Sequence, residues 1–250
     1  MKIGLALGSG GIKGLAHIGV LEVLEKENVE IDIIAGSSAG AFIGAFYCAF
    51  KSVKEIKELA LKTNWKNLLG FLAGFKNKKF LNLDKIENFL EKYLGKINFN
   101  DLKIPLKVVA TDFKTGEKFI IEEGKVTKAV LASIAVPFIF GSVKFKNHLL
   151  IDGAFSLPVP VELIKDCNLK IAVSLQDDVE PLFLKRQNMI YILNRSIKIL
   201  QKNLSSSNLK FADIIIRPNF RNISLKDIFD KSKFIERGKK AAQDALKYLK

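Results

Sequence analysis

The sequence has few residues of the types that bind metal ions or form disulfide bonds. Its 250 residues include two cysteines and two histidines, and His17 and His148 lie far apart in the chain. The usual clusters of zinc ligands are therefore excluded. Two cysteines without a secretory context favour a reducing compartment. We expect a cytoplasmic protein that binds no metal and no cofactor.

Long apolar segments and linkers are missing as well. The apolar N-terminal run Met1–Leu7 leads into glycines rather than into a cleavage site with small residues. The next apolar run, Ala39–Phe50, is too short for the roughly 20 residues that cross a bilayer. No repeat, low-complexity block or tract rich in proline and serine divides the chain. We therefore expect a single domain over residues 1–250 that does not span a membrane.

Acidic residues are outnumbered by basic ones. The chain has 40 lysines and arginines against 26 aspartates and glutamates, which gives a net charge of +14. Such a charge attracts anionic surfaces, although scattered surface lysines would give the same total. No basic motif with interleaved aromatic residues is present, so no nucleic acid is expected as a partner. We expect peripheral contact with the anionic inner face of a membrane, and the sequence does not determine the oligomeric state.

The chain does contain a regular alternation of short and long apolar segments. Runs of strand length occur at Lys2–Leu7, Ile31–Ala35, Leu106–Ala110, Lys118–Ile121, Leu149–Ile151, Lys170–Ser174 and Asp213–Arg217. Segments typical of helices occur at Leu15–Asn28, Ala39–Phe50, Val53–Thr63, Asp84–Leu94, Val126–Ala135, Phe183–Leu204 and Lys231–Leu249. This alternation predicts an α/β fold of three layers, α/β/α, with a mostly parallel central sheet.

Residues Gly8–Gly14 form a glycine-rich loop between the first expected strand and the first expected helix. Backbone N–H groups of such a loop and the positive end of the helix bind negative charge. The dinucleotide pattern Gly-x-Gly-x-x-Gly fails because Lys13 stands at its last position, and no Walker sequence is present. An oxyanion is therefore favoured over a pyrophosphate. Lys13 either attracts an anionic substrate or is a solvated residue at the start of the helix.

The sequence Gly36-Ser37-Ser38-Ala39-Gly40 stands between an expected strand and an apolar helix. This is the setting of a nucleophile elbow, a strained turn that exposes the hydroxyl of its central serine, here Ser38. The alternative is a turn of small residues that only lets the helix pack closely.

A nucleophilic serine needs a base. Each histidine is a weak candidate, because His17 is expected to be packed or hydrogen-bonded in a helix and His148 to be solvated at a hairpin tip. Asp152 is the better candidate, since it ends a short apolar strand and is followed by the small residues Gly153 and Ala154. Asp152 could equally form an Asx turn or cap a helix.

Together these three motifs resemble the patatin-like phospholipase family, which combines a Gly-[Gly/Ser]-Gly-Gly-x-[Lys/Arg]-Gly loop, a Gly-x-Ser-x-Gly elbow and an Asp-Gly-[Ala/Gly] element in this order. Further similar stretches are Leu15–Leu21, Ala110–Asp112, Ala132–Pro137 and Pro158–Val161. Each motif alone is weak, but three in order are specific. The resemblance covers about two-thirds of the 250 residues and fades after Asp177.

The resemblance implies a patatin-like serine acyl hydrolase that needs no calcium and cleaves esters of phospholipids or lysophospholipids through an acyl-enzyme. Ser38 would be the nucleophile and Asp152 the general base of a dyad. The backbone N–H groups of Gly10 and Gly11 would form the oxyanion hole. The alternative is a catalytically silent protein that binds membranes or regulates others on a hydrolase scaffold.

Two segments leave their roles open. Leu68–Phe80 combines apolar and aromatic residues with three lysines, and is either a flap that dips into an anionic membrane or a buried cap. The amphipathic segment Phe183–Leu204 fits either packing on the sheet or binding at a surface.

Overall fold

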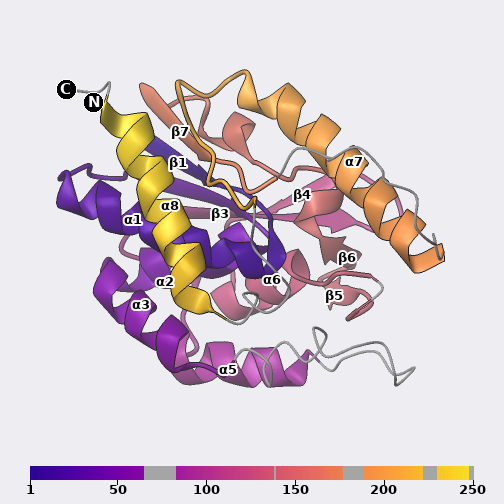
Figure 1. Cartoon of the computed structure of the whole chain (residues 1–250). Coiled ribbons are helices and arrows are strands. Elements are labelled where there is room, and N and C mark those ends of the chain that lie inside the picture. Colours follow the sequence, from indigo (N-terminus) through magenta and orange to yellow (C-terminus); the bar gives the residue numbers. More distant parts are fainter. Residues whose placement is uncertain (65–82, 138, 177–188, 222–229, 248–250) are drawn as a thin grey trace.

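The computed structural model describes residues 1–64, 83–137, 139–176, 189–221 and 230–247 (Figure 1). Its strands are β1 (Ile3–Leu7), β2 (Ile33–Ser37), β3 (Leu106–Asp112), β4 (Lys118–Ile121), β5 (Val143–Phe145), β6 (His148–Asp152), β7 (Leu169–Val173) and β8 (Ile214–Ile216). Its α-helices are α1 (Ala16–Lys26), α2 (Ala39–Phe50), α3 (Val53–Lys62), α5 (Asp84–Leu94), α6 (Val126–Ser133), α7 (Met189–Leu209) and α8 (Lys231–Leu246). Short 3-10 helices are η1 (Gly11–Leu15), η3 (Phe99–Asp101), η4 (Gly153–Phe155) and η5 (Val161–Ile164).

The strands form one sheet in the order β5-β6-β3-β2-β1-β7-β8, and β4 also pairs with β3. The pairs from β3 through β2, β1 and β7 to β8 are parallel, whereas β4, β5 and β6 pair in antiparallel fashion. The expected mostly parallel sheet is thus confirmed, with an antiparallel extension at one end. The sequence did not predict β5, because three residues are too few to show an alternating pattern.

Helices cover both faces of the sheet. Successive residues of a strand point to opposite faces. Leu5 and Leu7 of β1 therefore join the larger hydrophobic cluster, to which α1, α2, α6 and α8 contribute. Ala6 points the other way into a smaller cluster, where Leu209 of α7 and Val161 and Ile164 of η5 pack. The three-layer α/β/α arrangement expected from the sequence is confirmed.

The last helix packs directly on the first one, as Figure 1 shows for α8 and α1. Two glycines bring the helices into contact. A Cβ atom at Gly19 would lie 1.9 Å from the carbonyl oxygen of Ile235, and one at Gly238 would lie 1.9 Å from that of Ala16. Because backbone atoms cannot rotate away as a side chain can, any larger residue would push the helices apart.

Several expected boundaries differ from the structure. Helix α7 extends to Leu209, five residues beyond the expected end at Leu204. The helix continues through Ser205–Ser207, because the hydroxyls of Ser205 and Ser206 donate to carbonyl groups one turn back and Leu209 is buried. Helix α6 ends at Ser133, two residues before the expected Ala135. The segment Leu68–Phe80 lies outside the described residues.

No helix in the described part of the chain has the length and apolar character needed to cross a membrane.

Candidate active site

Strand pairing along β3 brings Ser38 and Asp152 together. Ser37, the last residue of β2, pairs with Val109, and Asp152, the last residue of β6, pairs with the next residue, Ala110. Strand β4 pairs with Val109 and Ala110 as well, so it occupies the other edge of β3. Strands β2 and β6 therefore lie end to end on one edge of β3, running toward each other. The residue that follows β2 consequently meets the residue that ends β6.

The turn at Ser38 has the strained geometry of a nucleophile elbow. Ser38 has φ +53° and ψ −118°, a conformation that residues with a side chain rarely adopt. Helix α2 starts at the next residue and lies close to β1, because a Cβ at Gly40 would stand 2.0 Å from the carbonyl oxygen of Leu7. The surrounding packing thus holds the turn, and it presents the Ser38 hydroxyl at the end of the parallel strands.

The hydroxyl of Ser38 donates a hydrogen bond of 2.6 Å to Oδ2 of Asp152. Both residues are buried, with exposed fractions of 8% for Ser38 and 2% for Asp152. The other carboxylate oxygen, Oδ1, accepts a hydrogen bond of 2.8 Å from the backbone N–H of Ala154. The Asx turn considered from the sequence is therefore present, and it fixes the carboxylate in the orientation that meets Ser38.

Burial raises the pKa of Asp152 to about 6, because desolvation penalises the charged form. The hydrogen bonds from Ser38 and from the N–H of Ala154 act in the opposite direction, since they favour the carboxylate. The carboxyl is therefore mostly ionised at neutral pH and is a stronger base than an ordinary aspartate with a pKa near 3.9. This arrangement suits a group that accepts a proton from a serine.

Ser133 is part of the site and was not singled out from the sequence. Its hydroxyl oxygen accepts a hydrogen bond of 2.8 Å from the backbone N–H of Ser38, and its side chain is fully buried. This bond ties the strained backbone of Ser38 to the end of helix α6. A polar residue at the end of the apolar helix α6, just before Val136 and Pro137, was the available signal.

The glycine-rich loop lies beside the elbow. Ser9 donates its N–H to the carbonyl of Pro158, and a Cβ at Gly14 would stand 2.5 Å from the Cβ of Ala39. Gly11 has φ +57°, which glycine adopts at little cost. In the described part of the chain, the N–H groups of Gly10 and Gly11 have no hydrogen-bond acceptor. They are therefore free to bind an anion.

The two histidines stand apart from the Ser38 hydroxyl. His17 is fully buried, and its Nε2 lies 2.8 Å from the carbonyl oxygen of Gly8, which confirms the expected hydrogen-bonded role. Burial lowers the pKa of His17 to about 4, so the ring is neutral and donates from Nε2. It thereby fixes the start of the glycine-rich loop.

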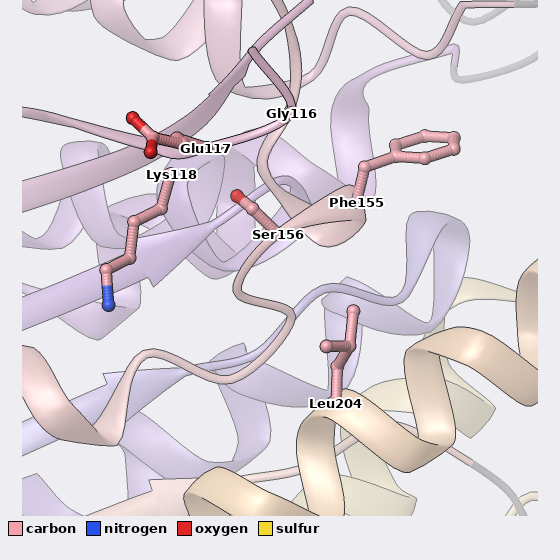
Figure 2. Close-up of a pocket in the computed structure, with 6 residues that line it drawn as sticks. All are labelled: Gly116, Glu117, Lys118, Phe155, Ser156 and Leu204. Carbon is pink, nitrogen blue, oxygen red and sulfur yellow. The ribbon is translucent and has the colours of Figure 1, made fainter.

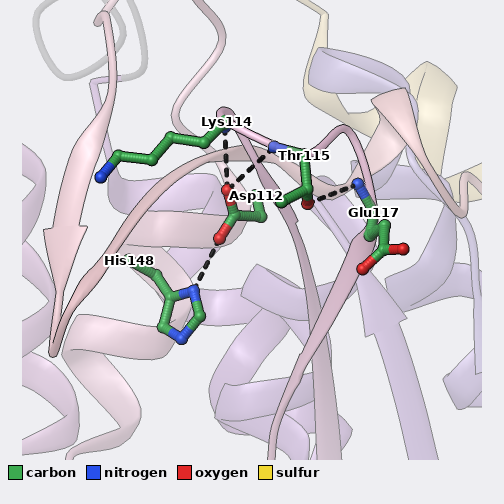
Figure 3. A network of polar contacts seen from close by, with 5 residues as sticks. All are labelled: Asp112, Lys114, Thr115, Glu117 and His148. Carbon is green, nitrogen blue, oxygen red and sulfur yellow. Dashed lines mark hydrogen bonds and ion pairs between the residues drawn. The ribbon is translucent and has the colours of Figure 1, made fainter.

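The expected hairpin tip at Lys146–His148 is confirmed, because β5 and β6 pair across a turn at Lys146 and Asn147, but the His148 side chain is bonded rather than simply solvated. His148 is only partly exposed, and its Nδ1 lies 2.6 Å from Oδ2 of Asp112 (Figure 3). Asp112 also accepts from the backbone N–H groups of Lys114 and Thr115, and these bonds, His148 first, lower the pKa of its carboxyl. His148 starts β6 directly after the hairpin turn, and its ring packs against Phe119.

Lys13 lies in η1, at the start of the first helical segment, and is partly buried. Its Nζ lies 5.0 Å from the centre of the Phe220 ring, which is the arrangement of a cation–π contact. Phe220 follows β8, so this contact ties the glycine-rich loop to the C-terminal part of the chain.

A groove of about 580 Å³ lies near the site but does not contain the Ser38–Asp152 pair. Its lining residues are Gly116, Glu117, Lys118, Phe155, Ser156 and Leu204 (Figure 2). The Ser156 hydroxyl lies 2.8 Å from that of Thr111, which donates to the backbone carbonyl of Asp152. Thr111 and Ala110 point to opposite faces of the sheet, so the groove is on the face opposite the Asp152 carboxylate.

The described residues contain no group of three or more side chains of His, Cys, Asp or Glu placed to hold a metal ion. What they do bring together is a hydroxyl, a buried carboxylate with a raised pKa, and a glycine-rich loop that packs against the elbow. This set can activate a nucleophile and stabilise an oxyanion, which is the requirement for acyl transfer.

Comparison with known proteins gives consistent results. The model of the patatin-like phospholipase family matches residues 5–164. An uncharacterized NTE family protein of Mycobacterium tuberculosis is 34% identical over 177 residues, which cover 70% of this chain and 49% of that protein. The lysophospholipase NTE1 of Pyricularia oryzae is 27% identical over 189 residues, which cover 71% of this chain and 12% of that protein. The chain thus spans about half the length of the mycobacterial relative and a much smaller share of the fungal one.

Solved structures with similar folds are more distant in sequence. VipD from Legionella pneumophila superposes with a TM-score of 0.58 at 14% identity, over 99% of this chain and 66% of that one. The type III effector protein ExoU superposes with a TM-score of 0.53 at 14% identity, over 99% of this chain and 53% of that one. These similarities support the fold.

Proposed function

Because this chain belongs to the patatin-like phospholipase family, we propose that it hydrolyses ester bonds of phospholipids or lysophospholipids, with Ser38 as nucleophile and Asp152 as general base. The observation that carries the proposal is the 2.6 Å hydrogen bond from the buried Ser38 hydroxyl to the buried Asp152 carboxylate. Relatives named as lysophospholipases support the same substrate class.

The first half of the reaction forms an acyl-enzyme. Asp152 takes the proton from the Ser38 hydroxyl while the oxygen attacks the ester carbonyl carbon. The negative charge on the carbonyl oxygen is bound by the N–H groups of Gly10 and Gly11, and each such donor lowers the barrier by roughly 3–4 kcal/mol. As the tetrahedral intermediate collapses, the ester C–O bond breaks and the protonated Asp152 gives its proton to the leaving alcohol.

The second half releases the fatty acid. Asp152, ionised again, takes a proton from a water molecule that attacks the acyl carbonyl, and the same N–H groups bind the second oxyanion. Collapse of this intermediate breaks the bond to Ser38, whose oxygen recovers the proton from Asp152. The hydrogen bond from the Ser38 N–H to Ser133 keeps the nucleophile in place through both halves.

The test is covalent labelling by a fluorophosphonate probe, together with hydrolysis of p-nitrophenyl butyrate, lysophosphatidylcholine and phosphatidylcholine. We expect the wild type to be labelled and to hydrolyse at least one lipid, and Ser38→Ala to do neither. Ser37→Ala is the matched control, because the buried Ser37 hydroxyl has no hydrogen-bond partner among the described residues and its loss should leave labelling intact. A wild type that is neither labelled nor active would favour the catalytically silent alternative.

The rate should depend on pH through Asp152. The raised pKa means that the carboxyl is protonated, and so inactive as a base, below about pH 6, and ionised above it. We expect kcat/KM for p-nitrophenyl butyrate to rise as pH increases through about 6 and then to level off. An ordinary aspartate would place this midpoint near 3.9. Circular dichroism at each pH would verify folding, and a flat profile down to about pH 4.5 would contradict the assignment.

A further inference from the structure

Helix α7 exposes a row of large apolar side chains. Met189, Ile192, Leu193, Ile199 and Leu200 are all exposed, with fractions of 84% for Met189 and 62% for Leu200. Their spacings of three, four and seven residues place them on one side of the helix. We call these five residues the α7 apolar face. Exposed apolar patches of this kind mark sites of interaction.

The opposite side of α7 fixes how the helix is turned. Ser205 and Leu209 are buried, and Leu209 packs with Val159, Val161 and Ile164 in the smaller hydrophobic cluster. The C-terminal half of α7 is thus anchored to the fold. Figure 1 shows the N-terminal half projecting past β5 and β6 at the right of the view. The α7 apolar face therefore points away from the sheet.

The charges of α7 indicate what the face contacts. The helix contains Arg195, Lys198 and Lys202 and no acidic residue, and Lys210 follows it directly. The whole chain has a net charge of +14. A second copy of the chain would bring a helix of the same sign against this one, which is unfavourable. Arg195 and Lys202 lie three or four residues from Ile199 and so flank the α7 apolar face, whereas Lys198 lies on the anchored side of the helix. An apolar face flanked by basic residues matches a bilayer with anionic headgroups.

The helix also leads toward the groove described above. Leu204 of α7 lines this groove together with Phe155 and Ser156, which follow Asp152 by three and four residues. The Ser156 hydroxyl contacts that of Thr111, which donates to the Asp152 carbonyl. A surface bound by α7 would therefore lie near Phe155 and Ser156, just after β6, on the face of the sheet opposite the Asp152 carboxylate.

We propose that the α7 apolar face docks on the surface of an anionic lipid bilayer. The five apolar side chains enter the boundary between headgroups and acyl chains, and Arg195 and Lys202, which flank them, contact the headgroups. The proposal rests on the proposed function for its physiological meaning, because an enzyme that cleaves membrane lipids must reach them. The binding itself does not require catalysis.

The experiment measures co-sedimentation of the full chain with vesicles of phosphatidylcholine, with and without phosphatidylglycerol. Every protein in this experiment carries the Ser38→Ala substitution, so that hydrolysis cannot alter the vesicles. We expect binding to the mixed vesicles, and a loss of affinity of roughly tenfold or more when Ile199→Ser and Leu200→Ser are combined. Arg195→Glu, on the flank of the α7 apolar face beside Ile192 and Ile199, should weaken binding to the mixed vesicles and not to pure phosphatidylcholine.

The matched control is Leu61→Ser. Leu61 and Ile199 are both 40% exposed, but Leu61 lies on α3, on the other side of the molecule in Figure 1. This variant should bind vesicles like the parent protein. The proposal is overturned if the α7 double variant also binds like the parent, or if Leu61→Ser weakens binding equally. It is also overturned if sedimentation velocity shows a dimer that the double variant dissociates while vesicles are not bound.

A second measurement separates this proposal from the proposed function. In the active protein, the α7 double variant should hydrolyse soluble p-nitrophenyl butyrate at the wild-type rate and lose activity only on vesicles. Absence of any hydrolysis by the wild type would reject the proposed function and leave the vesicle-binding result standing. Equal hydrolysis of vesicles by wild type and double variant would reject the docking proposal alone.

Discussion

Asp152→Asn is expected to lower kcat/KM for every ester substrate by roughly 10²- to 10⁴-fold while the protein stays folded. The amide has the same shape as the carboxylate, and its oxygen can still accept the N–H of Ala154. Its NH₂ group then faces the Ser38 hydroxyl, to which it can only donate. The variant therefore loses the base without losing the turn. Steady-state hydrolysis of p-nitrophenyl butyrate at about pH 8, above the Asp152 pKa, measures the effect.

The stability of Asp152→Asn should change in the opposite direction to its activity. A carboxyl whose pKa is raised from 3.8 to about 6 by folding binds more protons in the native state between these values, so stability falls as pH rises through them. Above pH 6 the wild type carries this cost in full, and it amounts to as much as about 3 kcal/mol. The neutral amide avoids it. We expect a higher urea midpoint for Asp152→Asn than for the wild type at pH 8, and little difference near pH 4.

A double variant provides the control. If Asp152 acts only through Ser38, combining Asp152→Asn with Ser38→Ala should cost no more than Ser38→Ala alone. Full activity in Asp152→Asn would reject the dyad, because Ser38 would then have another base. If Asp152→Asn were unfolded at pH 8, this would contradict the expectation that removing the buried charge stabilises the protein.

Gly40→Ala is expected to destabilise the protein by about 3–5 kcal/mol, although the change adds a single methyl group. The new Cβ would lie 2.0 Å from the carbonyl oxygen of Leu7 and 2.9 Å from that of Gly8, and backbone atoms cannot turn aside. Helix α2 would have to move away from β1, which would displace Ser38 at its N-terminal end. We expect a lower urea midpoint by circular dichroism and loss of fluorophosphonate labelling.

Gly44→Ala in the same helix is the matched control. Its Cβ would meet Ile34 Cγ2 at 3.2 Å, and the next atoms stand at 3.5 Å, which are side-chain contacts that can adjust. Alanine in a helix interior is favoured over glycine by about 1 kcal/mol, which offsets this crowding. Gly44→Ala should therefore stay within about 1 kcal/mol of the wild type. Equal stability of the two variants would show that contact between α2 and β1 does not hold the elbow.

Local sequence was enough for most elements of the fold. Strands such as β1 and β4 and helices such as α2 and α5 follow from the spacing of apolar residues over a short stretch. This spacing repeats every two residues in a strand and about every 3.6 in a helix, so it shows which kind of element the residues form. The same reasoning failed for β5, which is too short to show a period. It also failed at the end of α7, where burial of Leu209 and bonds from serine hydroxyls carry the helix past polar residues.

The sequence by itself also determined the candidates for chemistry, Ser38, Asp152 and the loop Gly8–Gly14, because elbow and loop motifs are local arrangements of small residues. It left open whether Asp152 is only a turn former. The tertiary structure decided that question through strand pairing, since β2 and β6 meet end to end on β3 and leave 2.6 Å between hydroxyl and carboxylate. Burial then raises the pKa of Asp152, and only the complete fold supplies this burial. The same holds for Ser133, which is 95 residues from Ser38 in the chain and hydrogen-bonded to it in space.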